Sequence, residues 1–297
     1  MKYFDYLEPT TLSEASLLLA EYGKDARALA GGTDLLVRMK RQALAPRYLI
    51  NLKRIPGLAS IEANDSTLRI GALATIRAVH TSPAVRQQWA VIGEAAQKMA
   101  SVQVRNLATI GGNLCNAAPS ADMAPALIGL GAQARIVSSS GERIISLEEF
   151  FVGPGATALG QGELLAELIV PAPPSNTGAI YVKHAIRKAM DIAMVGVAIV
   201  LTLDSSGKRL NEVRVVLGAV APTPMRARKT EDVLRGKAVP LDDAVLSEAA
   251  EAATAEARPI SDVRASEYYR RKLVGVLVKR AAIQALERAS EGRVVAN

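Results

Sequence analysis

The sequence LAGGTDLLVRMK, residues 29–40, places two glycines and a threonine between a short apolar run and a helical pattern. Glycine has no Cβ, so Gly31 and Gly32 can take a positive φ and let a ligand approach their backbone amides. Amides that point inward ahead of a helix form a concave anion site. A tight turn without a ligand is the ordinary alternative for one such pair. This stretch therefore predicts a strand-to-helix connection, with anion binding as a hypothesis that needs further support.

A second stretch, TIGGN at residues 109–113, repeats the order of apolar residue, two glycines and small polar residue. Thr33, Asn113 and Ser120 could add side-chain hydrogen bonds to an anion. Two such stretches favour a diphosphate held between two loops. The chain has no P-loop motif, and the glycine-rich GPGATA at residues 153–158 contains a proline and leads into no clear helix, so it does not predict a dinucleotide fold.

The sequence around the first glycine pair predicts a small β-α-β-type unit. Thr11 and Glu14 fit a capping box at the start of a helix, and Gly23 fits its end. A strand follows at ARALA, residues 26–30, then a short helix through Met39 and a second strand at RYLINL, residues 47–52. We expect this unit to end near residue 57.

A second unit is expected after it. It has a strand at residues 66–75, one long helix at residues 84–100, the glycine turn leading into a helix, and a hairpin around residues 140–141. The proline-rich LIVPAPPSNTG at residues 168–178 is the best candidate for a domain boundary. The expected elements beyond it are antiparallel strands within 179–204 and 212–222, then helices, the last spanning about 265–288. These patterns predict an α+β fold.

Composition narrows the functional class. The chain has 297 residues, 49% of them hydrophobic and only 4% aromatic, and a formal charge of +7 with scattered basic residues. This scatter favours a solvated basic surface over a nucleic-acid interface. We expect a cytoplasmic protein, because no apolar run reaches membrane length and the first residues do not resemble a signal peptide. The single cysteine, Cys115, excludes a disulfide or a four-cysteine cluster within this chain.

The motifs together resemble the FAD-binding medium subunit of the molybdenum hydroxylases, a family that includes xanthine dehydrogenase and aerobic carbon monoxide dehydrogenase. The resemblance spans nearly the whole chain. It rests on ALAGGTDL, QVRNLATIGGNLCNAAPSAD, KHAIRKAMDIAMVGVAI, LGAVAPTPMRA and SDVRASEYYRRKL, which start at residues 28, 103, 183, 217 and 261. One of these motifs alone would be weak, but all of them in this order are specific.

The resemblance implies a two-lobed FAD-binding domain of the p-cresol methylhydroxylase-like type, followed by a smaller domain with an antiparallel sheet and helices. The implied units are residues 1–57 and 58–175 for the two α/β halves and 176–297 for the C-terminal domain. It also implies non-covalent FAD, wrapped at its pyrophosphate by the first glycine loop and supported by the second. The implied cofactor-binding residues are Ala28, Leu29, Ala30, Gly31, Gly32, Thr33, Asp34, Leu35, Met99, Thr109, Ile110, Gly111, Gly112, Asn113, Asp122, Leu165 and Lys183. The implied loop beside the flavin ring contains Arg187, Lys188, Asp191, Ile192 and Ala193.

The function implied is electron transfer. Two 2Fe–2S clusters on a small partner subunit would deliver electrons, a large partner subunit would carry the molybdenum cofactor, and FAD would pass the electrons to NAD, a quinone or oxygen. A dimer of heterotrimers is the implied assembly, with no metal on this chain. A self-sufficient flavin oxidase or dehydrogenase is one alternative, but no substrate-binding base is apparent. The other is a non-catalytic subunit whose glycine loops are only turns. Met99 departs from the eukaryotic xanthine enzymes, which place an aromatic residue there, although a thioether can also contact an aromatic ring.

Several single residues keep two interpretations. Asp122 fits a helix cap, a cofactor ligand or both. Lys183 and Asp191 fit an ion pair, which within the resemblance would tune the flavin potential. His184 fits a structural residue better than a catalytic one, and His80 fits a helix end better than an anchor for covalent flavin. Cys115 fits a small buried hydrophobe better than a redox group.

Overall fold

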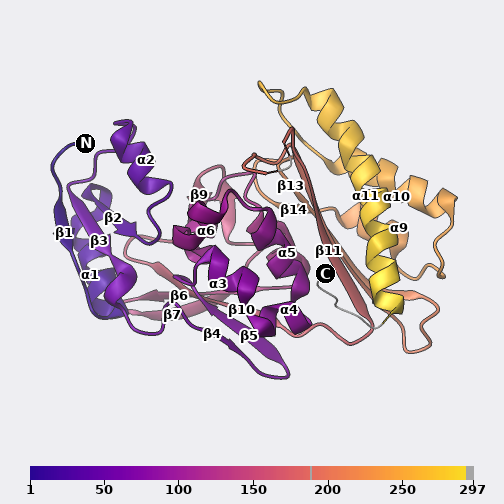
Figure 1. Cartoon of the computed structure of the whole chain (residues 1–297), viewed down its shortest axis with the longest axis horizontal. Coiled ribbons are helices and arrows are strands. Elements are labelled where there is room, and N and C mark those ends of the chain that lie inside the picture. Colours follow the sequence, from indigo (N-terminus) through magenta and orange to yellow (C-terminus); the bar gives the residue numbers. More distant parts are fainter. Residues whose placement is uncertain (188, 292–297) are drawn as a thin grey trace.

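The computed structural model describes residues 1–187 and 189–291, so Lys188 lies outside the described residues. In this part of the chain the strands form sheets of three, five, four and two strands (Figure 1). Helices and strands alternate through the first half, and helices gather at the C-terminal end. The predicted α+β fold is confirmed.

The first sheet is parallel, with strand order β1-β3-β2. Its elements in chain order are β1 (Asp5–Leu7), α1 (Leu12–Tyr22), the 3-10 turn η1 (Gly23–Asp25), β2 (Ala26–Leu29), α2 (Leu35–Lys40), β3 (Tyr48–Asn51) and η2 (Leu52–Arg54). The predicted cap is present, because Thr11 Oγ1 accepts from the Glu14 amide at 3.1 Å and Gly23 ends α1 with a φ of 47°. The β-α-β unit is confirmed, and β1 is a strand that the sequence patterns missed.

The second sheet is antiparallel, with order β4-β5-β10-β6-β7. Its strands and the helices between them are β4 (Ile61–Ala63), β5 (Thr67–Gly71), α3 (Ile76–Thr81), α4 (Pro83–Gln88), α5 (Ala90–Lys98), α6 (Val102–Leu107), α7 (Ile110–Cys115), α8 (Met123–Gly129), β6 (Gln133–Ser138), β7 (Gly141–Ser146) and β10 (Leu164–Pro171). A separate hairpin consists of β8 (Phe151–Gly153) and β9 (Ala156–Thr157), which is where the rejected GPGATA lies. The hairpin predicted around residues 140–141 is confirmed as β6–β7.

Two local predictions in this region are wrong. The single helix expected over residues 84–100 is two helices, broken at Trp89 with φ −119° and ψ 38°. The break allows the buried indole to donate from Nε1 to Pro171 O at 3.0 Å, a contact that a continuous helix would not supply. The second glycine pair does not form a turn either, because Gly111 and Gly112 lie in the first turn of α7.

The third sheet is antiparallel, with order β11-β12-β13-β14. The last elements of the chain are β11 (Thr177–His184), β12 (Val195–Leu203), β13 (Leu210–Gly218), β14 (Met225–Arg226), α9 (Arg228–Leu234), α10 (Asp243–Glu256) and α11 (Glu267–Ser290). Every residue of β12 is buried, because α8 covers one side of this sheet and α11 the other. The strands and the final helix predicted from the sequence are confirmed.

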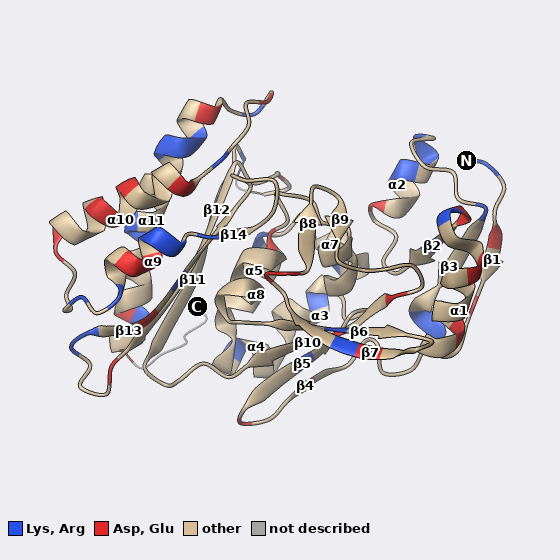
Figure 2. Ribbon diagram, turned by 180° about the vertical axis from the view of Figure 1, so that it is seen from behind, with Lys and Arg blue, Asp and Glu red and all other residues tan. Residues whose placement is uncertain are grey.

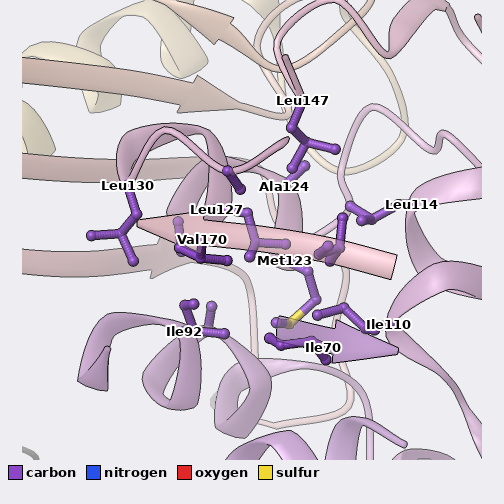
Figure 3. Close-up of a cluster of buried hydrophobic side chains, with 14 of the residues drawn as sticks. Ile70, Ile92, Ile110, Leu114, Met123, Ala124, Leu127, Leu130, Leu147 and Val170 are labelled. Carbon is purple, nitrogen blue, oxygen red and sulfur yellow. The ribbon is translucent and has the colours of Figure 1, made fainter. Parts of the chain in front are cut away.

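Helix α8 packs the second and third sheets together in one hydrophobic cluster. All seven of its residues are buried. Figure 3 shows Met123 beside Ile70 and Ile110, with Leu127 and Val170 close by. The same cluster extends to Ala198 and Val216 of the third sheet, whereas the first sheet packs in a separate cluster with Ala26 and Ile50.

The surface carries both signs of charge. Figure 2 shows acidic residues along α10 and both basic and acidic residues along α11. None of the helices described here combines the length and the apolarity needed to cross a membrane.

Candidate functional site

A large cavity with a volume of about 430 Å³ lies where the first glycine loop faces α7. Its other walls come from Ala72 and Leu73 just after β5, from Met99 just after α5, and from the segment that leads into β10. Thirteen of the sequence-predicted residues line it: Ala28, Ala30, Gly31, Gly32, Thr33, Asp34, Leu35, Met99, Thr109, Gly111, Gly112, Asn113 and Leu165. The structure therefore brings the two glycine motifs together around one cleft.

The two positions of the first loop require glycine for different structural reasons. Gly32 has a φ of 76°, a conformation that L side chains rarely adopt. A Cβ on Gly31 would lie 2.2 Å from the carbonyl oxygen of Leu107, at the end of α6. Gly31 is thus required by close contact between the two lobes, and only Gly32 by the turn itself.

The backbone amides of this loop are available to a ligand. Within the described residues, the amides of Gly31, Gly32, Thr33 and Asp34 donate to no protein acceptor. The amide of Leu36 does, since it donates to Gly32 O at 3.0 Å as α2 begins. Consecutive free amides at the edge of a cavity are suited to an anion.

The second glycine pair is different. The prediction that both pairs offer backbone amides to a ligand is therefore wrong. Gly111 N donates to Ala72 O at 2.8 Å, and Gly112 N to Thr109 Oγ1 at 3.1 Å. A Cβ on Gly111 would lie 2.6 Å from Ala72 O. These amides are already satisfied, so this pair packs α7 against β5 and offers the cleft a side chain, Asn113, in place of amides.

Asn113 has an unsatisfied acceptor. Its Oδ1 is buried and accepts no hydrogen bond in the described part of the chain, while Nδ2 lies 3.8 Å from Met99 Sδ. Arg105 donates from Nη1 to Met99 O at 2.6 Å and fixes the backbone there. A buried acceptor without a donor is unfavourable unless a ligand or water completes it. Asn113 Oδ1 therefore indicates where a ligand with a hydrogen-bond donor would sit.

A second cavity of about 300 Å³ lies at the end of β11. It is lined by Lys98, Lys183, His184, Ala185, Ile186, Arg187, Ala189, Met190 and Asp191. Lys98 lines this cavity and its neighbour Met99 lines the first one, so the end of α5 separates the two. An elongated ligand could contact both cavities across residues 98–99.

A buried charge cluster lies behind the second cavity. Asp122 accepts from Lys183 Nζ and from Tyr181 Oη, both at 2.8 Å. Asp122 makes no side-chain cap on α8, so the capping interpretation is wrong. Burial raises the pKa of Asp122, and the Lys183 ammonium and the Tyr181 hydroxyl oppose that rise. Tyr181 was not singled out in the sequence, because the only pattern that included it was the alternation of residues along β11.

The predicted pairing of Lys183 with Asp191 is also wrong. Asp191 accepts from its own loop instead, from Arg187 N at 2.8 Å and Ile192 N at 2.9 Å. These backbone hydrogen bonds, the one from Arg187 first, hold the pKa of Asp191 below its usual value. Asp191 thus shapes the loop that follows β11, and Lys183 belongs to the buried cluster.

The remaining predicted residues do not line the large cavity. Leu29 and Ile110 are buried beneath it, Ala193 is buried, and Ile192 is exposed. The prediction for Lys188 falls outside the described residues. The sequence reasoning missed other lining residues: Arg27, Arg38, Ala72, Leu73, Cys115, Asn116 and the segment 159–164. Only Arg38 had a usable signal, since it lies one helical turn after Asp34.

The two histidines lie at the ends of their elements, whereas Cys115, expected to be buried, is only partly buried and lines the large cavity. His80 lies in the last turn of α3, with Nδ1 3.1 Å from Gly93 O, and His184 is the last residue of β11. Burial raises the pKa of the Cys115 thiol to about 12, which keeps it protonated. No cluster of potential metal ligands occurs among residues 1–187 and 189–291.

Two family models match successive parts of the chain. Residues 2–173 match the FAD binding domain in molybdopterin dehydrogenase, and residues 180–285 match the CO dehydrogenase flavoprotein C-terminal domain. The chain is 36% identical over 286 residues to the carbon monoxide dehydrogenase medium chain of Afipia carboxidovorans, covering 96% of this chain and 98% of the relative. It is 32% identical over 289 residues to the xanthine dehydrogenase FAD-binding subunit of Escherichia coli, covering 97% of each.

Solved structures agree with the sequence comparison. The chain is similar to a chain of carbon monoxide dehydrogenase from Hydrogenophaga pseudoflava, with a TM-score of 0.92 and 36% identity over 97% of this chain and 98% of the other. It is also similar to a chain of quinoline 2-oxidoreductase from Pseudomonas putida, with a TM-score of 0.90 and 32% identity over 98% and 100% of the two chains. The likeness covers nearly the whole chain.

Proposed function

Because this chain belongs to the FAD-binding medium subunits of the molybdenum hydroxylases, we propose that it carries electrons from a partner subunit through FAD to an external acceptor. The iron–sulfur clusters of a small subunit would be the donor, and NAD, a quinone or oxygen the acceptor. The observation that carries the proposal is the row of free amides at Gly31–Asp34 beside a cavity that also holds an unsatisfied Asn113 oxygen. Bound FAD would supply a redox centre that exchanges one or two electrons, which no side chain here can do.

The residues present fit such a cofactor. The four free amides precede a helix start, and both features favour a diphosphate. Arg38, which also lines the cavity, adds positive charge from α2. Asn113 and Thr109 offer polar atoms on the opposite wall, while Leu165 and Met99 offer apolar surface. This chain therefore provides what a diphosphate with attached aromatic groups needs: donors at one place and apolar contact around it.

The second cavity is where we place the flavin ring, on the resemblance of the loop at residues 187–193. Here the chain's task is to orient the ring and to set the charge around it. Lys183 is held by Asp122, which is itself held by Tyr181, so its ammonium has a fixed position. Asp191 ties residues 187–192 into one loop shape. No side chain of this chain is required as an acid or base on the organic substrate.

We further propose that the chain works in the cytoplasm with a large molybdenum-cofactor subunit and a small iron–sulfur subunit, as a dimer of heterotrimers. Relatives named as medium chains and as members of a dehydrogenase complex support this assembly. We also propose that residues 1–57, 58–175 and 176–297 are the structural units. The three large sheets, each within one of these ranges, support that division.

Native mass spectrometry of the protein isolated from its own cells, combined with metal analysis, tests the proposal. We expect a large assembly that carries FAD, iron and molybdenum together with this chain. A single chain with FAD and no metal, after a check for dissociation, would favour a self-sufficient flavoenzyme. A chain purified without any flavin would overturn the proposal.

A further inference from the structure

The charges beside the second cavity are almost all paired. Three described cations in this region each have a carboxylate partner within ion-pair distance. The pairs are Lys183 with Asp122 at 2.8 Å, Arg187 with Asp191 at 3.8 Å, and Arg288 with Glu94 at 2.6 Å. Each pair is close to neutral as seen from the cavity, so none of them gives it a strong positive field.

Lys98 differs from these three. Its ammonium donates to the carbonyl oxygen of Tyr181 and lies 5.5 Å from the centre of that ring. Within the described residues no carboxylate lies within ion-pair distance of it. Neutral carbonyl and aromatic partners orient the ammonium without cancelling its charge. Lys98 therefore supplies the uncompensated positive charge among the described residues that line this cavity.

The position of Lys98 is fixed from both sides. It is the last residue of α5, where the helix dipole favours a cation. Its carbonyl oxygen accepts from Lys183 Nζ at 3.1 Å, so the two lysines are linked. Although the residue is exposed, partial desolvation of the ammonium lowers the pKa of Lys98, with Glu94 opposing that change. A partly desolvated cation acts more strongly on a neighbour in the cavity than a solvated one.

We propose that Lys98 raises the electron affinity of the bound flavin by stabilising the negative charge that the ring gains on reduction. Two electrons from the iron–sulfur donor and one proton from solvent leave the ring with one additional negative charge. This inference rests on the proposed function, because it requires the ring to occupy the second cavity. Lys98 was outside the set of residues predicted from the sequence.

The test uses the intact complex, with Lys98→Met to remove the charge and Lys98→Arg to keep it. Each protein is equilibrated with a reference redox dye at low ionic strength, and the ratio of reduced to oxidised flavin is read from the absorption spectrum. We expect Lys98→Met to lower this ratio about tenfold, the effect of one partly screened charge. Lys98→Arg should stay close to the wild type.

Lys272→Met is the matched control. Lys272 lies 5.6 Å from the ring of Tyr268 on α11, nearly the same cation–aromatic geometry, but it does not line either cavity. We expect no change in its flavin ratio. A Lys98→Met complex with full FAD content and an unchanged ratio would overturn the inference.

Two other outcomes can be distinguished from a redox role of Lys98. If both Lys98→Met and Lys98→Gln lose FAD while Lys98→Arg retains it, the charge serves cofactor binding and the redox role is wrong. If the wild-type complex contains no FAD, the proposed function fails first, and this inference fails with it.

Discussion

Lys183 donates a 2.8 Å hydrogen bond to Asp122, and the side chains of both residues are less than a tenth exposed, at 8% and 7%. The pair joins the end of β11 in the third sheet to the start of α8, so it links two parts of the fold that are far apart in sequence. Removing two charges from water is unfavourable unless their remaining hydrogen-bonding capacity is satisfied. Tyr181 Oη completes Asp122 at 2.8 Å, which makes the buried pair tolerable.

Lys183→Met is expected to destabilise the chain strongly, because it leaves a buried carboxylate without its cation. Breaking such a pair costs about 3 to 5 kcal/mol, while replacing both partners with apolar groups costs much less. We expect the free energy of unfolding in urea to fall by about 3 kcal/mol in Lys183→Met. The double variant Asp122→Leu/Lys183→Met should recover much of that loss.

Lys279→Met provides the control for this pair. Lys279 also bonds an aspartate, Asp243, but those side chains are 35% and 84% exposed. An exposed pair contributes about 0 to 1 kcal/mol, so this variant should unfold close to the wild type. If Lys183→Met and Lys279→Met lowered the free energy of unfolding equally, the assignment of Lys183 to a buried cluster would be wrong.

Gly32→Ala is expected to weaken FAD binding, because Gly32 sets the direction of the free amides. At its φ of 76°, a Cβ costs about 1 to 2 kcal/mol, and the loop can relieve that strain by turning its amides away from the cavity. We expect a lower ratio of FAD to protein in the purified complex, measured from the flavin and protein absorbance.

Gly207→Ala separates this effect from backbone strain in general. Gly207 has a φ of 70° in the β12–β13 hairpin, and a Cβ there would meet nothing within 4 Å. It should lose a similar amount of stability and keep its FAD. If both alanine variants retain full FAD, the amides of residues 31–34 do not hold the diphosphate.

Much of the fold could be predicted because its signals are local. The cap at Thr11, the stop at Gly23 and the continuous apolar run of β12 each depend on residues a few positions apart. The break at Trp89 could not be predicted, since the hydrogen bond made there goes to Pro171 on a distant strand. The two glycine motifs were predicted to share a cleft, and they do, from spacing and residue type alone.

The site was predicted in outline but not in its contacts. Sequence proximity suggested Asp191 as the partner of Lys183, whereas the fold brings Asp122 there from the start of α8. The sequence also suggested that both glycine pairs donate amides, but Ala72 and Thr109 already accept those of the second pair. Which acceptor satisfies which donor depends on long-range packing, so one sequence cannot determine it.

Arg270→Met is expected to disturb the segment that follows the flavin-ring loop. Arg270 is 2% exposed and donates to Met194 O at 2.7 Å, to Ala219 O at 3.3 Å and to Asp262 Oδ1 at 2.8 Å. Its removal leaves buried acceptors without donors, which costs about 3 kcal/mol. Thermal unfolding and limited proteolysis near residue 194 would measure the effect.

Arg264→Met is the comparison for that variant. Arg264 bonds the same Asp262 at 2.6 Å, but its side chain is 30% exposed and no bond joins it to Met194 or Ala219 in the described chain. We expect a loss below about 1 kcal/mol and no new cleavage near residue 194. Similar cleavage in both variants would show that Asp262, and not the Arg270 donors, fixes this segment.

Glu163→Gln is expected to have an effect that depends on pH. Glu163 lies in the segment that lines the large cavity and accepts two hydrogen bonds from Arg143, at 2.8 and 2.7 Å, and one from Gly160 N at 2.7 Å. The Arg143 guanidinium is the main cause that lowers the pKa of Glu163 from 4.5 to about 2. After allowance for solvent screening, we expect the pair to contribute about 1 kcal/mol at pH 7.

The sign of the pH dependence follows from the direction of that shift. Folding favours the carboxylate, so the stabilisation is complete above pH 4.5 and is lost as the pH falls toward about 2. We therefore measure the free energy of unfolding in urea at pH 7, 5, 4 and 3. The difference in this free energy between wild type and Glu163→Gln should shrink only below about pH 4.5. Glu142→Gln, with a side chain 59% exposed beside Arg135, should differ from wild type by less than about 0.5 kcal/mol at pH 7. A Glu163→Gln difference that stays constant from pH 7 to 3 would mean that shape, and not charge, makes Glu163 stabilising.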